Sequence, residues 1–153
     1  MISANELRIG NWYNDGYRHK KVTAAFIQKL QSLHKIKSAS LRFYTPIPLT
    51  PEILEKAGFE FIEYEDITDS ASIFSLCSTY KHKKSFYSYD YYVNVIDGKG
   101  ETTEGITERT CFEFCLACPA TDGELIVAAQ IKYLHQLQNL YFALTGEELE
   151  INL

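Results

Sequence analysis

The sequence has little of what marks a secreted or membrane protein. Only four cysteines stand among its 153 residues, too few for the disulfide framework of a small secreted domain. The first residues, MISANELRIGN, lack the basic and apolar regions of a signal peptide. No apolar run approaches the ~20 residues that span a bilayer. These absences predict a reduced, cytoplasmic protein.

Motifs of several enzyme classes are also missing. The four histidines show neither the HxxxH nor the HxxE spacing of zinc hydrolases. The chain has no GxSxG elbow and no Walker loop, and Gly98 and Gly100 have no third glycine at the dinucleotide-binding spacing. We therefore expect no catalytic residues, no enzymatic activity and no cofactor.

Three of the cysteines invite a metal interpretation. Cys111, Cys115 and Cys118 have the spacing with which radical S-adenosylmethionine enzymes hold an iron–sulfur cluster. Only 35 residues follow Cys118, too few for the barrel of those enzymes, and the alternating phenylalanines indicate a strand. A zinc site completed by Cys77 or a histidine is the alternative. We expect small buried thiols and no metal.

What the chain does have is apolar and aromatic bulk. Hydrophobic residues make up 46% of it, mean hydropathy is -0.19, and 11 tyrosines and 9 phenylalanines can each bury a large area. This composition and length predict one folded domain spanning residues 1–153. The formal charge of -5 argues against general nucleic-acid binding, which needs excess lysine and arginine, although it allows a local basic patch.

The first fifty residues carry signals for short elements. The Ser-x-x-Glu spacing of Ser3 to Glu6 predicts a single helical turn, and apolar spacings of three and four predict a helix over 23–37. Strands are predicted at 7–13, 17–22 and 41–44, with a tight turn at Asn14-Asp15-Gly16.

The rest of the chain reads as strands between two helices. Thr50, Pro51 and Gly58 are typical of the start and end of a short helix. Strands follow at 59–64, 73–80, 85–96 and 106–117, with turns at 81–84, 97–100 and 119–123, and residues 124–128 are either a last strand or a lead-in to the final helix. That helix is predicted over 129–145, ended by Gly146. We expect an α+β fold: a mainly antiparallel sheet packed by a short central helix and a long C-terminal helix.

Three blocks together carry a family resemblance. They are NELRIGNW at 5–12, PIPLTPEIL at 46–54 and IKYLHQLQNLYFALTGEEL at 131–149. In these blocks and their order the chain resembles a family of short proteins from bacteriophages, prophages and mobile elements of anaerobic gut bacteria. The resemblance brings no activity with it. It implies a mobile-element context and hence the cytoplasm of a host cell.

One segment has binding character. Residues 81–92, KHKKSFYSYDYY, place Tyr87, Tyr89 and Tyr91 on one face of a strand beside a basic turn. Such a row can stack bases while lysines hold phosphates. The alternatives are tyrosines that pack under a helix, or a contact with another protein. The candidate residues here are Lys81, Lys83, Lys84, Tyr87, Tyr89, Tyr91 and Tyr92.

The final helix supplies the second candidate set. His135, Gln138 and Asn139 neighbour one another at spacings of three and four. Gln138 falls within the apolar arc, so its amide must find partners once buried. The set either pins a loop or strand edge against the helix or contacts a ligand.

Together these features predict a non-enzymatic binding protein. The lack of a catalytic set and the aromatic excess favour an accessory protein that engages a host or phage protein, with a counter-defence role and homo-oligomers as options. The alternative is a binder of a nucleotide or nucleotide-derived signal through the segment 81–92. We expect no membrane partner.

Overall fold

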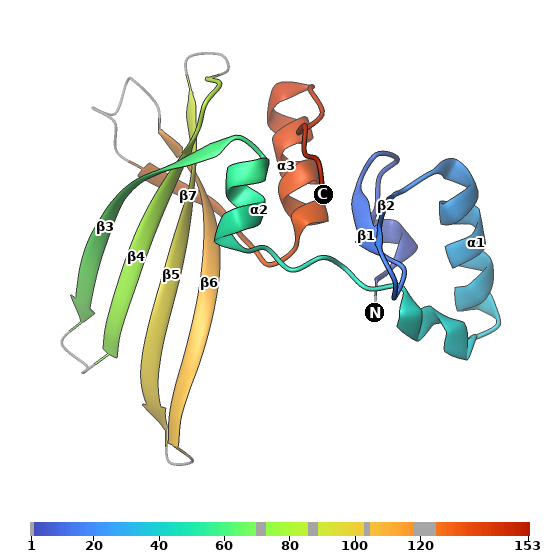
Figure 1. Ribbon diagram of the computed structural model, residues 1–153, viewed down its shortest axis with the longest axis horizontal. Coiled ribbons are helices and arrows are strands. Elements are labelled where there is room, and N and C mark those ends of the chain that lie inside the picture. Colours follow the sequence, from blue (N-terminus) through green and yellow to red (C-terminus); the bar gives the residue numbers. More distant parts are fainter. Residues whose placement is uncertain (1, 70–72, 86–88, 103–104, 118–124) are drawn as a thin grey trace. The chain divides into compact units, whose positions relative to one another are not determined.

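The computed structural model describes residues 2–69, 73–85, 89–102, 105–117 and 125–153. Within them lie three α-helices and seven strands in two antiparallel sheets, which confirms the predicted α+β class. The chain forms two compact units (Figure 1): residues 1–49 with 133–153, and residues 50–132. The expectation of a single domain stays a prediction. No helix in the described part of the chain is long and apolar enough to cross a membrane.

The first unit surrounds an aromatic core. Its elements are η1 (Ala4–Glu6), β1 (Trp12–Asn14), β2 (His19–Lys21), α1 (Ala24–Lys35), η2 (Ala39–Phe43) and α3 (Leu134–Thr145). The rings of Tyr13 and Phe26 stack with their centroids 3.9 Å apart, and Tyr44 meets Phe26 edge-on. Ile2, Val22 and Leu30 are fully buried in the same cluster.

The helix starts of this unit follow the sequence signals. Ser3 Oγ accepts from the N–H of Asn5 at the start of η1, and Thr23 Oγ1 accepts from the N–H of Phe26 at the start of α1. Both side chains satisfy N–H groups that a helix start leaves without a backbone partner. The predicted helical turn and the predicted helix over 23–37 are therefore confirmed, the helix with slightly shorter limits.

Two strand predictions in this unit are wrong. The segment 7–13 is a strand only from Trp12, because Gly10 adopts a φ of +94° and Asn11 Oδ1 accepts from the N–H of Arg8, which makes a turn. The segment 41–44 lies largely in the 3-10 helix η2, whose first turn is closed by Ser38 Oγ. In both places a local side-chain hydrogen bond competes with the extended conformation. The return strand shortens to β2.

The second unit begins with a short helix. In α2 (Pro51–Lys56), Thr50 Oγ1 accepts from the N–H of Ile53 at 3.3 Å and proline occupies the first turn. Gly58 follows with a φ of +87°, a conformation that costs glycine little. The predicted start and end of this helix are confirmed.

A five-stranded antiparallel sheet makes up the rest of this unit. Its strands are β3 (Phe59–Asp69), β4 (Ile73–His82), β5 (Asp90–Thr102), β6 (Gly105–Ala117) and β7 (Leu125–Ile131). They lie in sequence order, so every neighbour in the chain is a neighbour in the sheet and β3 and β7 are the edges. One face carries Val93 and Val95 opposite Phe114 and Phe112, and all four are buried.

Two predicted turns fall within strands. Lys81 and His82 end β4 instead of beginning a turn. Residues 97–100 pair with 107–110 of β6, and Thr110 Oγ1 donates to Asp97 Oδ1 at 2.6 Å. The ladder continues to the pair of Thr102 and Gly105, because cross-strand pairing outweighs the turn preference of the two glycines. The turn predicted at 119–123 lies outside the described residues.

The final helix begins later than predicted. Residues 129–131 belong to β7, where Ala129 pairs with Phe114 and Ile131 with Phe112. The helix α3 begins at Leu134, and the residue before it, Tyr133, is its N-cap. The Tyr133 N–H donates to Gln136 Oε1 in the first turn of the helix at 3.1 Å. Gly146, with a φ of +74°, follows its end as predicted. The predicted packing of helices on the sheet stays a prediction.

Candidate functional site

The tyrosine segment does not present a continuous row of rings. Tyr91 is 2% exposed and packs against Phe114 at 5.9 Å between centroids. Tyr89 is 39% exposed, and Tyr92 is half-buried beneath the Lys81 ammonium, which lies 5.6 Å from its ring centroid. Tyr87 lies outside the described residues. Burial removes Tyr91 from contact with any ligand on this strand.

Two of the three lysines in the same segment form ion pairs with carboxylates. Lys81 Nζ lies 2.7 Å from Asp90 Oδ2, which raises the pKa of Lys81 and lowers that of Asp90. Lys83 Nζ lies 3.1 Å from Glu60 Oε1. Lys84 is exposed. Phosphate binding here would have to compete with two existing ion pairs.

The three candidates on α3 are gathered against the N-terminal segment. Gln138, 2% exposed, accepts at Oε1 from the N–H of Trp12 at 3.0 Å. Asn139 Nδ2 donates to the carbonyl of Glu6 at 2.9 Å. His135 is 1% exposed, and its Nε2 lies 3.9 Å from Glu6 Oε2. The helix α3 thus holds two parts of the N-terminal segment in place. The sequence predicted either such a structural contact or a contact with a ligand.

These contacts leave buried polar atoms without a protein partner. Both ring nitrogens of His135 and Oδ1 of Asn139 make no hydrogen bond within the described chain. Burial lowers the pKa of His135, and the Glu6 carboxylate offsets only part of that effect. At neutral pH the imidazole is therefore neutral and does not form an ion pair with Glu6.

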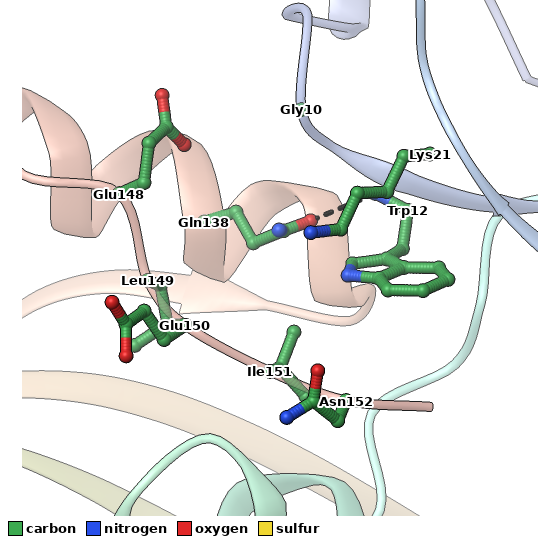
Figure 2. A pocket seen from close by; sticks show the side chains of 9 residues that line it. All are labelled: Gly10, Trp12, Lys21, Gln138, Glu148, Leu149, Glu150, Ile151 and Asn152. Carbon is green, nitrogen blue, oxygen red and sulfur yellow. Dashed lines mark hydrogen bonds between the residues drawn. The ribbon is translucent and has the colours of Figure 1, made fainter.

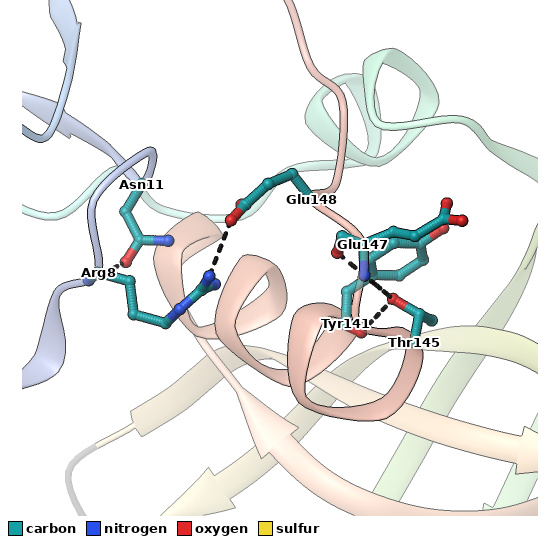
Figure 3. Close-up of polar contacts among 6 residues, drawn as sticks. All are labelled: Arg8, Asn11, Tyr141, Thr145, Glu147 and Glu148. Atoms are coloured by element: carbon teal, nitrogen blue, oxygen red, sulfur yellow. Dashed lines mark hydrogen bonds and ion pairs between the residues drawn. The ribbon is translucent and has the colours of Figure 1, made fainter.

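An arginine extends the same contact surface (Figure 3). The Arg8 guanidinium stacks on Phe142 of α3, with its central carbon 3.6 Å from the ring centroid. Arg8 Nη2 donates to Glu148 Oε1 at 2.8 Å, and Asn11 Oδ1 accepts from the Arg8 N–H at 2.7 Å. Arg8 Nη1 and Asn11 Nδ2 remain without acceptors in the described structure. No motif in the sequence predicts this arrangement.

A pocket of about 310 Å³ opens beside Trp12 (Figure 2). It is lined by Gly10, Trp12, Lys21, Gln138 and residues 148–152. The Lys21 ammonium lies 5.3 Å from the Trp12 ring centroid. The Gln138 amide points towards these two side chains, and its Nε2 has no acceptor among the described residues. With Lys21 on one side and the carboxylates of Glu148 and Glu150 on the other, the pocket has mixed charge.

The two edges of the large sheet differ in character. On β7, Leu125, Ile126 and Val127 are 36%, 54% and 52% exposed. Residues 125–131 contain no charged side chain. On β3, Ile62 is 50% exposed, but acidic residues stand at 60, 63, 65, 66 and 69. The edge at β7 is therefore apolar and the edge at β3 is acidic.

The cysteines lie in the sheet. Cys77 and Cys115 are buried and Cys111 is half-buried, and burial raises the pKa of all three thiols, that of Cys115 to about 11. Cys118 lies outside the described residues. In the part of the chain that the structure describes, no three His, Cys, Asp or Glu side chains come together as a metal site.

No family model, curated protein or solved structure matches the chain.

Proposed function

We propose that this is a non-enzymatic protein that binds a partner protein by strand addition at the β7 edge. The observation that carries the proposal is the run Leu125, Ile126 and Val127, exposed on consecutive positions of an edge strand. Consecutive side chains point to opposite faces, so both sides of this edge are apolar.

Sheet edges in natural proteins are usually protected against pairing. Charged side chains, proline and bulges are the common devices. The β3 edge has such protection in the exposed acidic side chains of Glu60, Glu63 and Glu65, the first of which pairs with Lys83. At β7 the described residues have no charge or proline, and the one device present is a bulge at Ala128, between the pairs of Val127 and Ala129 with β6. Residues 125–127 are thus the part of β7 open to regular pairing.

The chemistry of β7 defines its partner. An added strand forms backbone hydrogen bonds with the open edge, and apolar side chains at alternate positions cover the exposed residues on each face. An extended, uncharged, β-branched segment of another protein fits this edge. A second copy of β7 is such a segment, which supports the option of a homo-oligomer. The family resemblance supports a host or phage protein as the partner, a counter-defence role and a cytoplasmic setting.

The experiment compares one substitution at the two edges. Ile126→Lys on β7 and Ile62→Lys on β3 place the same charge at sites of nearly equal exposure, 54% and 50%. Light scattering after size exclusion measures self-association, and affinity capture with immobilised wild-type and variant protein measures binding of other proteins from the producing cell.

Ile126→Lys should abolish self-association or the binding of the captured partner protein. Ile62→Lys should leave self-association and partner binding intact. Circular dichroism confirms that both variants are folded. Equal loss in both variants, or no loss in Ile126→Lys, contradicts the proposal, as does a wild-type protein that stays monomeric and captures nothing specific.

A further inference from the structure

The charge of the chain is distributed very unevenly. Residues 1–49 contain eight of the 15 lysines and arginines but only two of the 20 acidic residues, which gives +6. The remaining residues carry seven cations and 18 acids, which gives -11. A segment this basic within an acidic chain indicates a site for an anion, which the net charge of -5 conceals.

A hollow of about 370 Å³ lies within this basic segment. Its lining residues are Tyr13, Asp15, Tyr17, Lys20, Lys29, Ser40, Phe43 and Tyr44. They come from the β1–β2 hairpin, from α1 and from η2 with the residue after it. Four of the eight are aromatic and two are lysines. All belong to the first unit, and none lies in the Trp12 pocket.

Two of the four aromatic rings of the hollow are largely exposed. Tyr17 is 95% exposed and Phe43 is 49% exposed. Both rings line the same hollow, so together they form one exposed aromatic surface. Their flat faces can stack with any planar group, and a nucleic-acid base is such a group.

The segments that display these rings are held in place. Asp15 Oδ1 accepts from the N–H groups of Tyr17 and Arg18, each at 3.0 Å. Asn14 and Thr45 exchange two backbone hydrogen bonds of 3.0 Å, which ties the hairpin to the segment after η2. A site held by its own hydrogen bonds loses little conformational freedom when a ligand binds.

The charges around the hollow favour an anion. Its one carboxylate, Asp15, is neutralised by an ion pair with Lys20. The Lys29 ammonium lies 5.2 Å from the Tyr44 ring centroid, and the Arg42 guanidinium carbon lies 5.1 Å from that of Phe43. Neither cation has a carboxylate partner in the described structure. Both are available to a phosphate.

We propose that this hollow binds a nucleotide unit, with the base stacked between Tyr17 and Phe43 and the phosphate held by Lys29 and Arg42. The Trp12 pocket does not fit such a ligand, because Glu148 and Glu150 line it. A free nucleotide and one residue of a single-stranded nucleic acid share this chemistry. The site is independent of the β7 edge.

The test measures fluorescence anisotropy of two probes, a fluorescent ATP analogue and a labelled oligothymidylate. Tyr17→Ala and Lys29→Glu should each weaken binding about tenfold or more. Lys35→Glu is the matched control, because it makes the same charge change on the exposed side of α1 and does not line the hollow. Tyr89→Ala tests the tyrosine strand as the competing location.

Binding of the ATP analogue identifies a free nucleotide as the ligand, and binding of the oligothymidylate alone identifies a strand. For a strand, the affinity should fall with salt with a slope of about -0.7 per phosphate contact. The proposal is overturned if folded wild-type protein binds neither probe. It is also overturned if Lys35→Glu weakens binding as much as Lys29→Glu, or if only Tyr89→Ala weakens it.

Discussion

Gln138 and Trp12, 126 positions apart in the chain, are joined by a hydrogen bond of 3.0 Å from a backbone N–H to a side-chain oxygen. The glutamine is 2% exposed and lies on the apolar side of α3. Its amide therefore fixes the start of β1 to the final helix. The bond connects the first and last of the three blocks that carry the family resemblance.

Replacing this glutamine should destabilise the protein. Gln138→Leu leaves the half-buried Trp12 N–H without its side-chain acceptor, which costs about 1 kcal/mol. Chemical denaturation measures the free energy of unfolding. Gln28→Leu on the exposed face of α1 is the control and should stay within about 0.5 kcal/mol of wild type. Equal stability of the two variants would show that the bond contributes nothing net.

The stability of the protein should fall as the pH falls below about 6.5. Burial lowers the pKa values of His135 and His82 in the folded state. As the pH falls, the unfolded chain takes up protons that the folded chain does not, so each histidine reduces the free energy of unfolding by at most about 1.4 kcal/mol per pH unit. Above the ordinary histidine pKa this penalty is absent.

His135→Phe removes one of these titrations while keeping a ring in the same place. Its stability should decline less steeply between about pH 7 and pH 5 than that of wild type. Urea denaturation at a series of pH values measures the difference. A slope identical to that of wild type would assign the pH dependence to other groups.

Two glycines isolate the cost of a left-handed backbone. Gly58 and Gly146 have φ values of +87° and +74°. An added Cβ at Gly58 would meet His82 Nε2 at a van der Waals distance of 3.4 Å, and at Gly146 it would meet nothing within 4 Å. Gly58→Ala and Gly146→Ala should therefore each cost about 1 kcal/mol from the backbone conformation. Thermal unfolding of both variants measures these costs, and a variant as stable as wild type would contradict this.

The buried thiols of Cys77 and Cys115 should be protected from alkylation in the folded protein. A pKa of about 11 leaves Cys115 almost entirely protonated at neutral pH, and the thiolate is the reactive form. Iodoacetamide followed by peptide mass spectrometry should find Cys115 and Cys77 unmodified until denaturant is added, with the half-buried Cys111 modified sooner. Rapid labelling of Cys115 in native protein would show that β6 opens readily.

The sequence predicted well those features whose cause lies within a few residues. The Thr50 cap involves only the N–H of Ile53, three residues later, and the stop at Gly58 depends only on the φ of that glycine. Both limits of α2 could therefore be predicted from the local sequence. The start of α3 could not, because Ala129 is held by a partner on β6, 15 positions earlier in the chain. Periodicity alone does not distinguish such a strand from a helix lead-in.

The binding features follow the same rule. The position of Gln138 on an apolar arc signalled a buried partner, but nothing local identified that partner as Trp12. The alternation of Tyr87, Tyr89 and Tyr91 in the sequence predicts a shared face if the segment is a strand, but it could not indicate that Tyr91 is buried. The hollow at Tyr17 and Lys29 was missed because it joins three elements, although the excess of cations before residue 50 was a readable signal.

The first unit is interrupted by the whole of the second. The chain leaves it after Leu49 and returns at Tyr133, and the two ends of the interruption are joined by the bridge of Pro48 with Tyr133 and by the bond from the Leu134 N–H to the Ile47 carbonyl at 2.9 Å. During synthesis on the ribosome, the N-terminal segment therefore emerges long before its helix α3 exists. The sheet of residues 50–132 can form before α3 is synthesised. The unit whose translation begins first is therefore the last to be completed.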